Sequence, residues 1–299
     1  MGLDGRVSAV EEVVEEAVDV PALRAWLVAH GVPGVDEVDT APGGGTTHRR
    51  HVRGTRPVEV VLPTDGPPRL RARDATGLAL LRRWLGLDHD PAAAAAALAD
   101  DPVLGPLVRA RPHVRVPGTP DPFEAAVNVV LGQHVSLAAG RVFAGRLVAA
   151  HGVVCPGGRP DDRPGTRRVV GPSPEALAAV DPEALRAAVG ITGGRARTLV
   201  ALARVVLDGL DLAPQPDPAR RAVTRAALLA LPGVGPWTAD LVAMRCLRDP
   251  DVFLPGDLVL RKALGGVTAR EAAAAAQAWA PHRSLAVVHL WTHHALDPR

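Results

Sequence analysis

The sequence predicts a mostly helical fold preceded by a small α+β domain built on an antiparallel sheet. The chain has 299 residues, which suits two domains at roughly 100–200 residues each. Before residue 74, apolar and polar residues alternate in short segments, which is typical of strands with one buried face. Beyond it, apolar residues recur at helical spacing. We therefore expect a sheet domain over residues 19–107 and an all-helical region of two lobes over 108–299.

The first hundred residues contain one helix and several strand candidates. Residues 1–18 are either an uncertain extension or the first strand, because AVEEVVEEAVDV fits an acidic helix as well as a strand. A helix is predicted over 21–30, begun by Pro21 and with Trp26 on its apolar face. The strand candidates are residues 35–38, 49–53, 58–62 and 69–73, with a long turn at 41–48.

Helix signals dominate the rest of the chain. Apolar spacing predicts helices over residues 75–85, 91–98, 122–135 and 137–150. Ser173-Pro174 and Asp181-Pro182 each begin another helix, because Ser and Asp cap helix N-termini and Pro is favoured at the first helical position. Between these groups, CPGGRPDDRPGTRR at 155–168 predicts an exposed, disordered loop.

Composition excludes several classes of protein. The 34 basic and 32 acidic residues give a net charge of +2, so nucleic-acid binding would need a local patch. The two cysteines, Cys155 and Cys246, are too few for a four-cysteine cluster or zinc site or a disulfide framework. No apolar run approaches the ~18 residues of a membrane span, and four glutamates near the N-terminus argue against a secretory signal. We expect a cytoplasmic protein without a membrane partner.

The segment LPGVGPWTA, residues 231–239, lies between two apolar helices. Gly233 and Gly235 flank the apolar Val234, so the chain can turn tightly and leave backbone amides pointing outward. Amides at a helix N-terminus bind anions such as phosphate without a lysine. These three residues are therefore a candidate contact to a nucleic-acid backbone. An ordinary corner between two helices is the alternative.

The residues around this turn resemble a known enzyme family. LPGVGPWTADLVAMR, followed by DVFLPGDLVLRKAL at 251–264, resembles the helix-hairpin-helix, Gly/Pro-rich loop and catalytic aspartate of the HhH-GPD DNA glycosylase superfamily. Within it, the chain is most similar to the bacterial 3-methyladenine DNA glycosylase II (alkylpurine DNA glycosylase) family. Residues 121–136 resemble that family's helix and DNA-intercalating loop, and AWAPHRSLAVVHLW at 278–291 resembles its last helices. The resemblance covers roughly residues 57–296 and implies the HhH-GPD fold.

By this resemblance Asp257, twenty residues after Trp237, is the catalytic carboxylate. Breaking an N-glycosidic bond builds positive charge on the sugar, and a nearby carboxylate stabilises that charge more than the neutral ground state. Asp257 also fits the N-cap of a helix over 258–263, and both roles can hold together. The family often places a second acid before this aspartate, whereas this chain has Gly256, so that neighbour has no assisting role here.

The lysine content bears on the type of reaction. Glycosylases that also cut the DNA backbone form a Schiff base through an amine. In related bifunctional enzymes that lysine stands at the position of Trp237. The only lysine of this chain, Lys262, follows Asp257 by one helical turn and is expected to contact phosphate or solvent. We therefore expect hydrolysis alone, without lyase activity, leaving an abasic site.

The resemblance makes Trp237 and Trp291 the walls of a pocket for a flipped base. A target base in a duplex must leave the stack and enter such a pocket. Alkylated purines are cationic, so aromatic faces attract them by cation–π interaction. The chain has no tyrosine, and Leu241 and Thr292 stand where family members usually carry tyrosines. The pocket is therefore expected to be less aromatic, which leaves the range of damaged bases open.

The resemblance also places the DNA wedge at His134, preceded by Gln133, where well-known members carry a bulky apolar residue. A histidine ring can fill the gap left by a flipped base by stacking, and a capping or surface role is the alternative. His289 and His293 are four residues apart but have no acid or cysteine at ligand spacing, so no metal site from side chains is expected. The family suggests a monovalent cation on the backbone carbonyls of the hairpin turn, and no other cofactor.

The sequence thus predicts a monomeric, monofunctional DNA glycosylase that removes alkylated purines such as 3-methyladenine from double-stranded DNA in base excision repair. Two alternatives stay open. One is a sibling glycosylase for oxidised or deaminated bases. The other is a non-catalytic hairpin module that binds damaged DNA, as the remnant of a fusion with an alkylation-response regulator. Asp257 separates the classes, because a pure binder would not need it.

Overall fold

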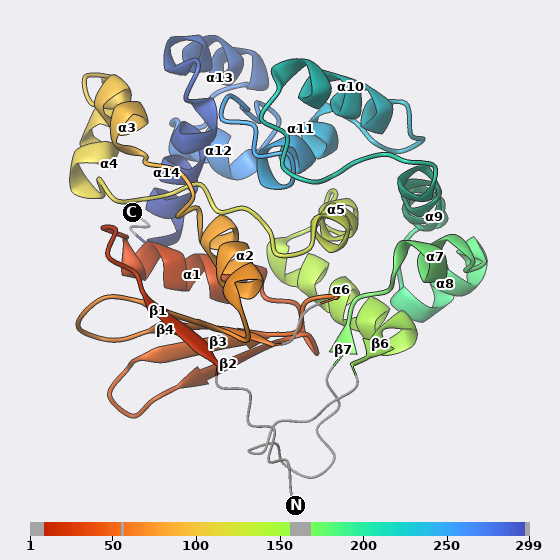
Figure 1. The fold of residues 1–299 in the computed structure, drawn as a ribbon. Coiled ribbons are helices and arrows are strands. Elements are labelled where there is room, and N and C mark those ends of the chain that lie inside the picture. Colours follow the sequence, from red (N-terminus) through yellow and green to blue (C-terminus); the bar gives the residue numbers. More distant parts are fainter. Residues whose placement is uncertain (1–8, 55–56, 156–168, 297–299) are drawn as a thin grey trace, which may run out of the picture.

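The computed structural model describes residues 9–54, 57–155 and 169–296. Within these ranges a five-stranded sheet lies along one side of a larger body of helices (Figure 1). Every pair of neighbouring strands is antiparallel, as the sequence predicts. In spatial order the strands are β1 (Val10–Val13), β5 (Arg69–Ala72), β4 (Val58–Leu62), β3 (Thr46–Arg50) and β2 (Asp36–Thr40).

The sequence left open whether the N-terminal segment is a helix or a strand, and the structure shows a strand, β1. Val10–Val13 pair with β5, so this stretch is an edge strand and not an acidic helix. Its Glu11 and Glu12 form ion pairs with Arg71 and Arg82, respectively. Charged side chains on an exposed edge also discourage pairing with a second sheet. Residues 1–8 lie outside the described residues.

Side-chain caps explain where many of the helices begin. Ten of them start after an Asp, Ser or Thr whose side chain accepts a backbone N–H of the first turn. The helices are α1 (Val20–His30), α2 (Ala75–Leu85), α3 (Ala92–Leu98), α4 (Leu104–Ala110), α5 (Pro122–Leu131), α6 (Leu137–His151), α7 (Pro174–Ala178), α8 (Pro182–Val189), α9 (Gly193–Leu207), α10 (Pro218–Leu229), α11 (Pro236–Arg245), α12 (Leu258–Ala263), α13 (Ala269–Ala275) and α14 (Arg283–Leu296), with a 3-10 turn at Ala276–Trp279.

The region predicted as all-helical contains one small exception. β6 (Val153–Val154) and β7 (Val169–Val170) pair antiparallel. Gly152 makes this approach possible, because a Cβ there would lie 2.5 Å from the Val169 side chain. These strands flank the predicted loop at 155–168, of which residues 156–168 lie outside the described residues.

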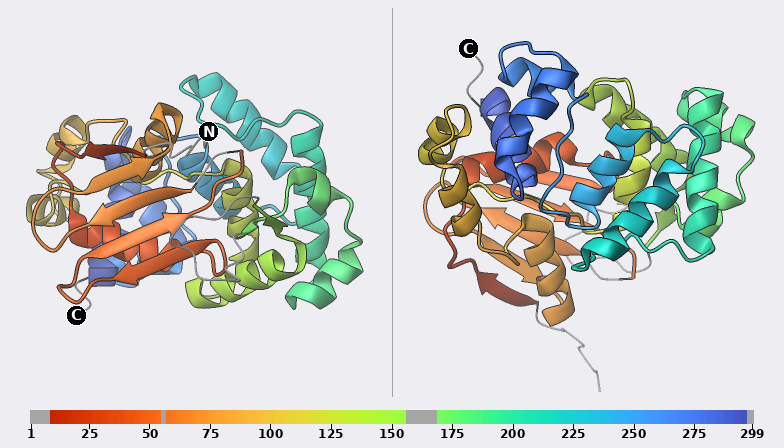
Figure 2. Two further views of the ribbon diagram at one scale, coloured as in Figure 1. Left: turned by 60° about the horizontal axis from the view of Figure 1, so that its bottom comes forward. Right: turned by 90° about the horizontal axis from the view of Figure 1, so that it is seen from above.

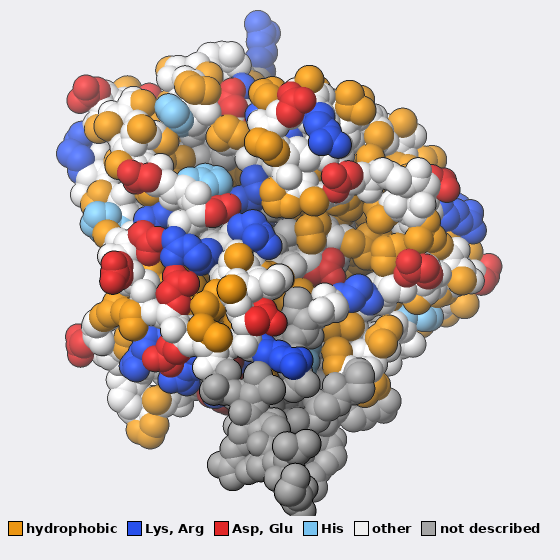
Figure 3. Space-filling model, viewed as in Figure 1, with side chains coloured by type: hydrophobic (Ala, Val, Ile, Leu, Met, Phe, Trp, Pro, Cys, Tyr) orange, Lys and Arg blue, Asp and Glu red, His pale blue; other side chains and the backbone are white. Residues whose placement is uncertain are grey.

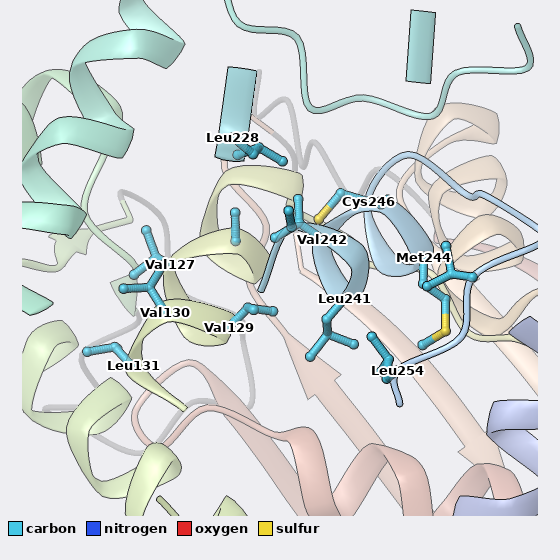
Figure 4. Close-up of a cluster of buried hydrophobic side chains, with 14 of the residues drawn as sticks. Val127, Val129, Val130, Leu131, Leu228, Leu241, Val242, Met244, Cys246 and Leu254 are labelled. Atoms are coloured by element: carbon cyan, nitrogen blue, oxygen red, sulfur yellow. The ribbon is translucent and has the colours of Figure 1, made fainter. Parts of the chain in front are cut away.

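Two hydrophobic clusters form the core. The first lies between the sheet and α2, with Leu23 and Leu27 of α1. The second fills the helical part, and Figure 4 shows a portion of it, with valines of α5 facing Leu241 and Val242 of α11. Helices α3 and α4 pack on α14, so residues 92–110 lie against the C-terminal helix. The domain boundary between residues 107 and 108 stays a prediction.

A buried network of charges joins the sheet to α5. Arg50 of β3 lies 2.5 Å from Glu124 of α5 and 3.3 Å from Asp36 of β2, and His48 lies 2.8 Å from Asp36. Burial raises the pKa of Glu124. Burial acts in the same direction on Asp36, but the Arg50 charge and the His48 hydrogen bond outweigh it, so the pKa of Asp36 is lowered. The sheet is therefore docked on α5 by ion pairs between largely buried side chains.

The sheet covers one side of the molecule, with helices behind and beside it (Figure 2). On the face drawn in Figure 3, acidic and basic side chains are interspersed, which agrees with the near-neutral net charge of +2. Among the described residues, no helix is both long and apolar enough to cross a membrane.

Candidate active site

A cavity of about 1370 Å³ lies where α1, the α5–α6 loop, α11, the start of α12 and α14 meet. Its walls come from segments that are more than 200 residues apart in the chain, from α1 to α14. Most of the site residues predicted from the sequence line this single space. They are Gln133, His134, Gly233, Gly235, Trp237, Asp257 and Trp291.

Asp257 is the N-cap of α12, and its two carboxylate oxygens have different surroundings. Oδ1 accepts the backbone N–H groups of Val259 (2.9 Å) and Leu260 (3.0 Å). The helix dipole and these amides favour a negative charge at this position. The capping role considered as an alternative is therefore present, and it leaves Oδ2 directed away from the helix amides.

Two indole N–H groups point at the same carboxylate. Trp237 Nε1 donates to Oδ2 of Asp257 (3.3 Å), and Trp291 Nε1 donates to Oδ1 (3.4 Å). The sequence identified both tryptophans only as walls for a flipped base. In the structure each one also orients the carboxylate through its ring nitrogen. Both side chains are half-buried, so their rings still face the cavity that they line.

A third aromatic residue, Trp26 of α1, was missed as a site residue. Its ring stacks on that of Trp291, with 6.2 Å between centroids, and on that of His30, with 3.7 Å. The guanidinium carbon of Arg245 lies 4.5 Å from the Trp26 ring centre. Trp26 and His30 share one helix face by their spacing, but no sequence signal shows that this face meets α14. The pocket gains an aromatic wall that partly compensates for Leu241 and Thr292.

Burial lowers the pKa values of Arg245 and His30, the two side chains that contact the Trp26 ring. It lowers the pKa of Arg245 to about 10, which leaves this side chain protonated at neutral pH. Burial, together with the nearby Arg245 charge, lowers the pKa of His30 to about 3. His30 is therefore neutral at neutral pH, and its Nδ1 donates to the carbonyl of Trp26 (3.0 Å). Arg245 is thus a fixed cation in the cavity wall.

The hairpin turn between α10 and α11 is braced from α9. Gly233 has φ +83°, and a Cβ there would lie 2.4 Å from Oγ1 of Thr198, so a glycine is required on both grounds. Thr198 Oγ1 donates to the carbonyl of Pro232 (2.7 Å). Gly235 is exposed, has open space around its Cα and is the N-cap of α11.

The backbone amide of Val234, one of the three predicted phosphate contacts, already has a hydrogen-bond partner within the turn. The N–H of Val234 donates to the carbonyl of Leu231 (3.1 Å), and the Val234 side chain is only 9% exposed. The contact of Val234 with phosphate stays a prediction. The carbonyls of Pro232 and Gly233 each accept a side-chain hydrogen bond, from Thr198 and Gln133 respectively. The monovalent cation on the backbone carbonyls of the turn stays a prediction.

The loop between α5 and α6 separates the two residues predicted as the wedge. The helix predicted to run to residue 135 ends at Leu131, and His134 beyond it is exposed, with φ +54°. Gln133 is only 9% exposed, and its side-chain amide donates to the carbonyl of Gly233 and the hydroxyl of Thr238. In this structure the Gln133 side chain therefore points inward, and its assignment to the wedge stays a prediction. His134 keeps that role as a prediction.

Lys262 is exposed on α12 and does not line the cavity. His289, considered and set aside as a ligand, is 2% exposed, and burial lowers its pKa to about 4. In the part of the chain that the structure describes, no three His, Cys, Asp or Glu side chains are grouped closely enough to hold a metal ion.

Residues 13–121 match the family described as the AlkA N-terminal domain. Over 279 residues the chain is 41% identical to a probable bifunctional transcriptional activator/DNA repair enzyme AlkA of Mycobacterium tuberculosis, covering 89% of this chain and 53% of that protein. It is 37% identical over 188 residues to DNA-3-methyladenine glycosylase 2 of Escherichia coli, covering 63% of each. The chain thus spans between about half and two thirds of the length of these relatives.

Among solved structures, the 3-methyladenine DNA glycosylase of Archaeoglobus fulgidus superposes with a TM-score of 0.74 at 19% identity, covering 96% of this chain and 98% of that one. At 19% identity this match shows a shared fold and nothing about activity. The resemblance drawn from the sequence is confirmed by these similarities. Residues 13–121 match the AlkA N-terminal domain, the fold is that of the solved 3-methyladenine DNA glycosylase, and the similar curated proteins include a DNA repair enzyme and a 3-methyladenine glycosylase of bacteria.

Proposed function

We propose that the protein is a monofunctional DNA glycosylase that hydrolyses the N-glycosidic bond of alkylated purines, such as 3-methyladenine, in duplex DNA. The observation that carries this proposal is the carboxylate of Asp257 at the edge of an aromatic-walled cavity, with an indole N–H on each oxygen. The names of the relatives, which are a DNA repair enzyme and a 3-methyladenine glycosylase, agree with it.

The chemistry follows from the two sides of Asp257. As the bond between sugar and base breaks, positive charge develops on the sugar, and Oδ2 is the oxygen free of helix amides that can face it. A fixed carboxylate stabilises this charge without reorganising during the reaction. The same oxygen can orient the attacking water. A flipped base would lie against the aromatic walls formed by Trp237 and Trp291.

Contact with DNA would come from two exposed features beside the cavity. The amides around Gly233 and Gly235 lie at the N-terminus of α11, where a phosphate is favoured by the helix dipole. His134 protrudes from the α5–α6 loop and would occupy the gap left by the flipped base. Because backbone amides bind the phosphate, no broad basic surface is needed.

Replacing Asp257 tests the catalytic assignment. Asn is as good an N-cap as Asp, so Asp257→Asn should unfold at nearly the wild-type temperature and still bind duplex DNA. Release of 3-methyladenine should fall by at least about 100-fold, because the charge opposite the sugar is lost. The exposed Asp65→Asn is the matched control. Wild-type release by Asp257→Asn would reject the assignment and favour a protein that only binds DNA.

Hydrolysis without lyase activity is supported by the position of Lys262, the only lysine, on an exposed face outside the cavity. No lysine amine is therefore placed to form a Schiff base with the sugar. After incubation with methylated duplex, strand breaks should appear only when alkali is added. Breaks without alkali would contradict this proposal.

Release of neutral, deaminated purines is a second candidate for the same site. Arg245 already lies against Trp26, and a fixed cation in the wall opposes a second cation in the pocket. Single-turnover release from duplexes containing 3-methyladenine or hypoxanthine decides between them. Faster release of hypoxanthine would favour the neutral substrate.

A further inference from the structure

The loop that carries His134 is tied to two distant elements through Gln133. The side-chain amide donates to the carbonyl of Gly233 (2.9 Å) and to Oγ1 of Thr238 (2.8 Å). The backbone carbonyl of Gln133 accepts Nη2 of Arg195 at the start of α9. The loop is thus bonded to the hairpin turn, to the first turn of α11 and to α9, although Gln133 and Gly233 are 100 residues apart.

These contacts lie away from water. Gln133 is 9% exposed and Thr238 is 4% exposed. The amide nitrogen has two protons, and both are used, one on the turn and one on α11. Both donations fix the orientation of the amide, and a buried amide without partners would be strongly unfavourable.

The hairpin turn is equally well held on its other side. Thr198 of α9 donates to the carbonyl of Pro232 and packs against Gly233. Helix α9 therefore supports the turn through Thr198 and the loop through Arg195. Gln133 completes this arrangement, because it joins the loop and the turn directly.

We propose that Gln133 is a positioning residue for base flipping, which locks the loop bearing His134 to the turn bearing Gly233 and Gly235. This inference rests on the proposed function. Flipping costs stacking energy, and a wedge offsets that cost only when it enters the duplex at the nucleotide whose backbone is being held. A loop that moved relative to the turn would let the protein hold the strand without filling the gap.

The test compares duplex and single-stranded substrates, because a single strand has no stack to open. Gln133→Met keeps the length and burial of the side chain but donates no hydrogen bond. Single-turnover release of methylated purines from duplex should fall by about tenfold, while release from a single-stranded oligonucleotide changes by less than about twofold. Gln277→Met, at an exposed glutamine on the 3-10 turn that does not line the cavity, is the matched control and should match wild type on both substrates.

Variants of Thr238, which accepts a hydrogen bond from Gln133, test whether that bond is what supports release from duplex. Thr238→Ser keeps the hydroxyl that accepts from Gln133 and should retain wild-type duplex release. Thr238→Val removes that acceptor but leaves the bond to Gly233, so it should give an intermediate loss on duplex only. Thermal unfolding of each variant is measured in parallel, to show that it is folded at the assay temperature.

Two outcomes would overturn the proposal. If Gln133→Met loses the same factor on duplex and single strand, Gln133 supports the pocket and not flipping. If Gln133→Met changes release from neither substrate, the hydrogen bonds from Gln133 to Gly233 and Thr238 have no role in the reaction. If wild-type protein releases no alkylated base from either substrate, the proposed function fails. The role of the Gln133 hydrogen bonds is then tested with a duplex that carries 2-aminopurine beside an abasic site. The 2-aminopurine fluorescence should rise when wild-type protein binds and should rise less when Gln133→Met binds.

Discussion

At the residue scale, Asp257 shows how one carboxylate can serve structure and chemistry together. Oδ1 accepts two helix amides and one indole, whereas Oδ2 accepts only the indole of Trp237 among the hydrogen bonds that involve the described residues. The capped oxygen fixes the side chain rotamer, and the other keeps a lone pair for the sugar or for water. Capping thus preorganises the carboxylate without consuming it.

The hydrogen bond from Trp237 can be tested separately from its aromatic ring. Trp237→Phe keeps an aromatic wall but removes the N–H that donates to Oδ2. Because this bond to a charged group is long, at 3.3 Å, single-turnover release should fall by only about three- to tenfold. Trp279→Phe is the matched control, since its indole donates to Asp101 (2.8 Å) outside the cavity. An equal loss in both variants would show that the effect is general destabilisation.

At the element scale, the hairpin turn between α10 and α11 is supported by Thr198 of α9. The GVG pattern predicts a tight turn, and the structure confirms it, with Gly233 at positive φ. What the pattern could not show is the contact with Thr198 of α9 or the hydrogen-bond partner of the Val234 amide. The Thr198 contact follows from the packing of α9 against the turn, whereas the Val234 amide is bonded to Leu231 within the turn itself.

Gly233→Ala tests this support. The new methyl group would lie 2.4 Å from Thr198 Oγ1, and the residue would be held at φ +83°. We expect duplex affinity to fall by about tenfold or more, with a lower melting temperature, because the turn must shift. Gly194→Ala, which has open space and lies in the first turn of α9, should leave both quantities near wild type. Unchanged duplex affinity in Gly233→Ala would contradict the role of the turn in DNA binding.

At the scale of the whole molecule, the sheet domain contributes to the cavity through α1. The network of Arg50, Asp36 and Glu124 docks the sheet on α5, and the same docking brings Trp26 against Trp291. The N-terminal part of the chain is therefore part of the candidate site. Sequence reasoning assigned it no site residue.

Glu124→Ala should loosen this docking. It leaves the buried Arg50 without one of its two carboxylates, and breaking such a pair costs about 3 kcal/mol of unfolding free energy. Because Trp26 would lose its fixed position, the substrate concentration for half-maximal release should also rise. Denaturant unfolding and steady-state release measure the two effects. Glu183→Ala breaks the exposed pair with Arg186 and should change neither. Equal results for both variants would exclude a special role for the buried network.

The sequence by itself determined the classes of element, the turn at Gly233, the catalytic candidate Asp257 and the resemblance to a glycosylase family. These properties reside in local spacing, capping residues and turn chemistry, all of which are readable along the chain. Only the tertiary structure decided that Gln133 points inward and that Trp26 and Arg245 reach the cavity. Those outcomes depend on which helix faces meet across more than a hundred residues, and packing alone selects them.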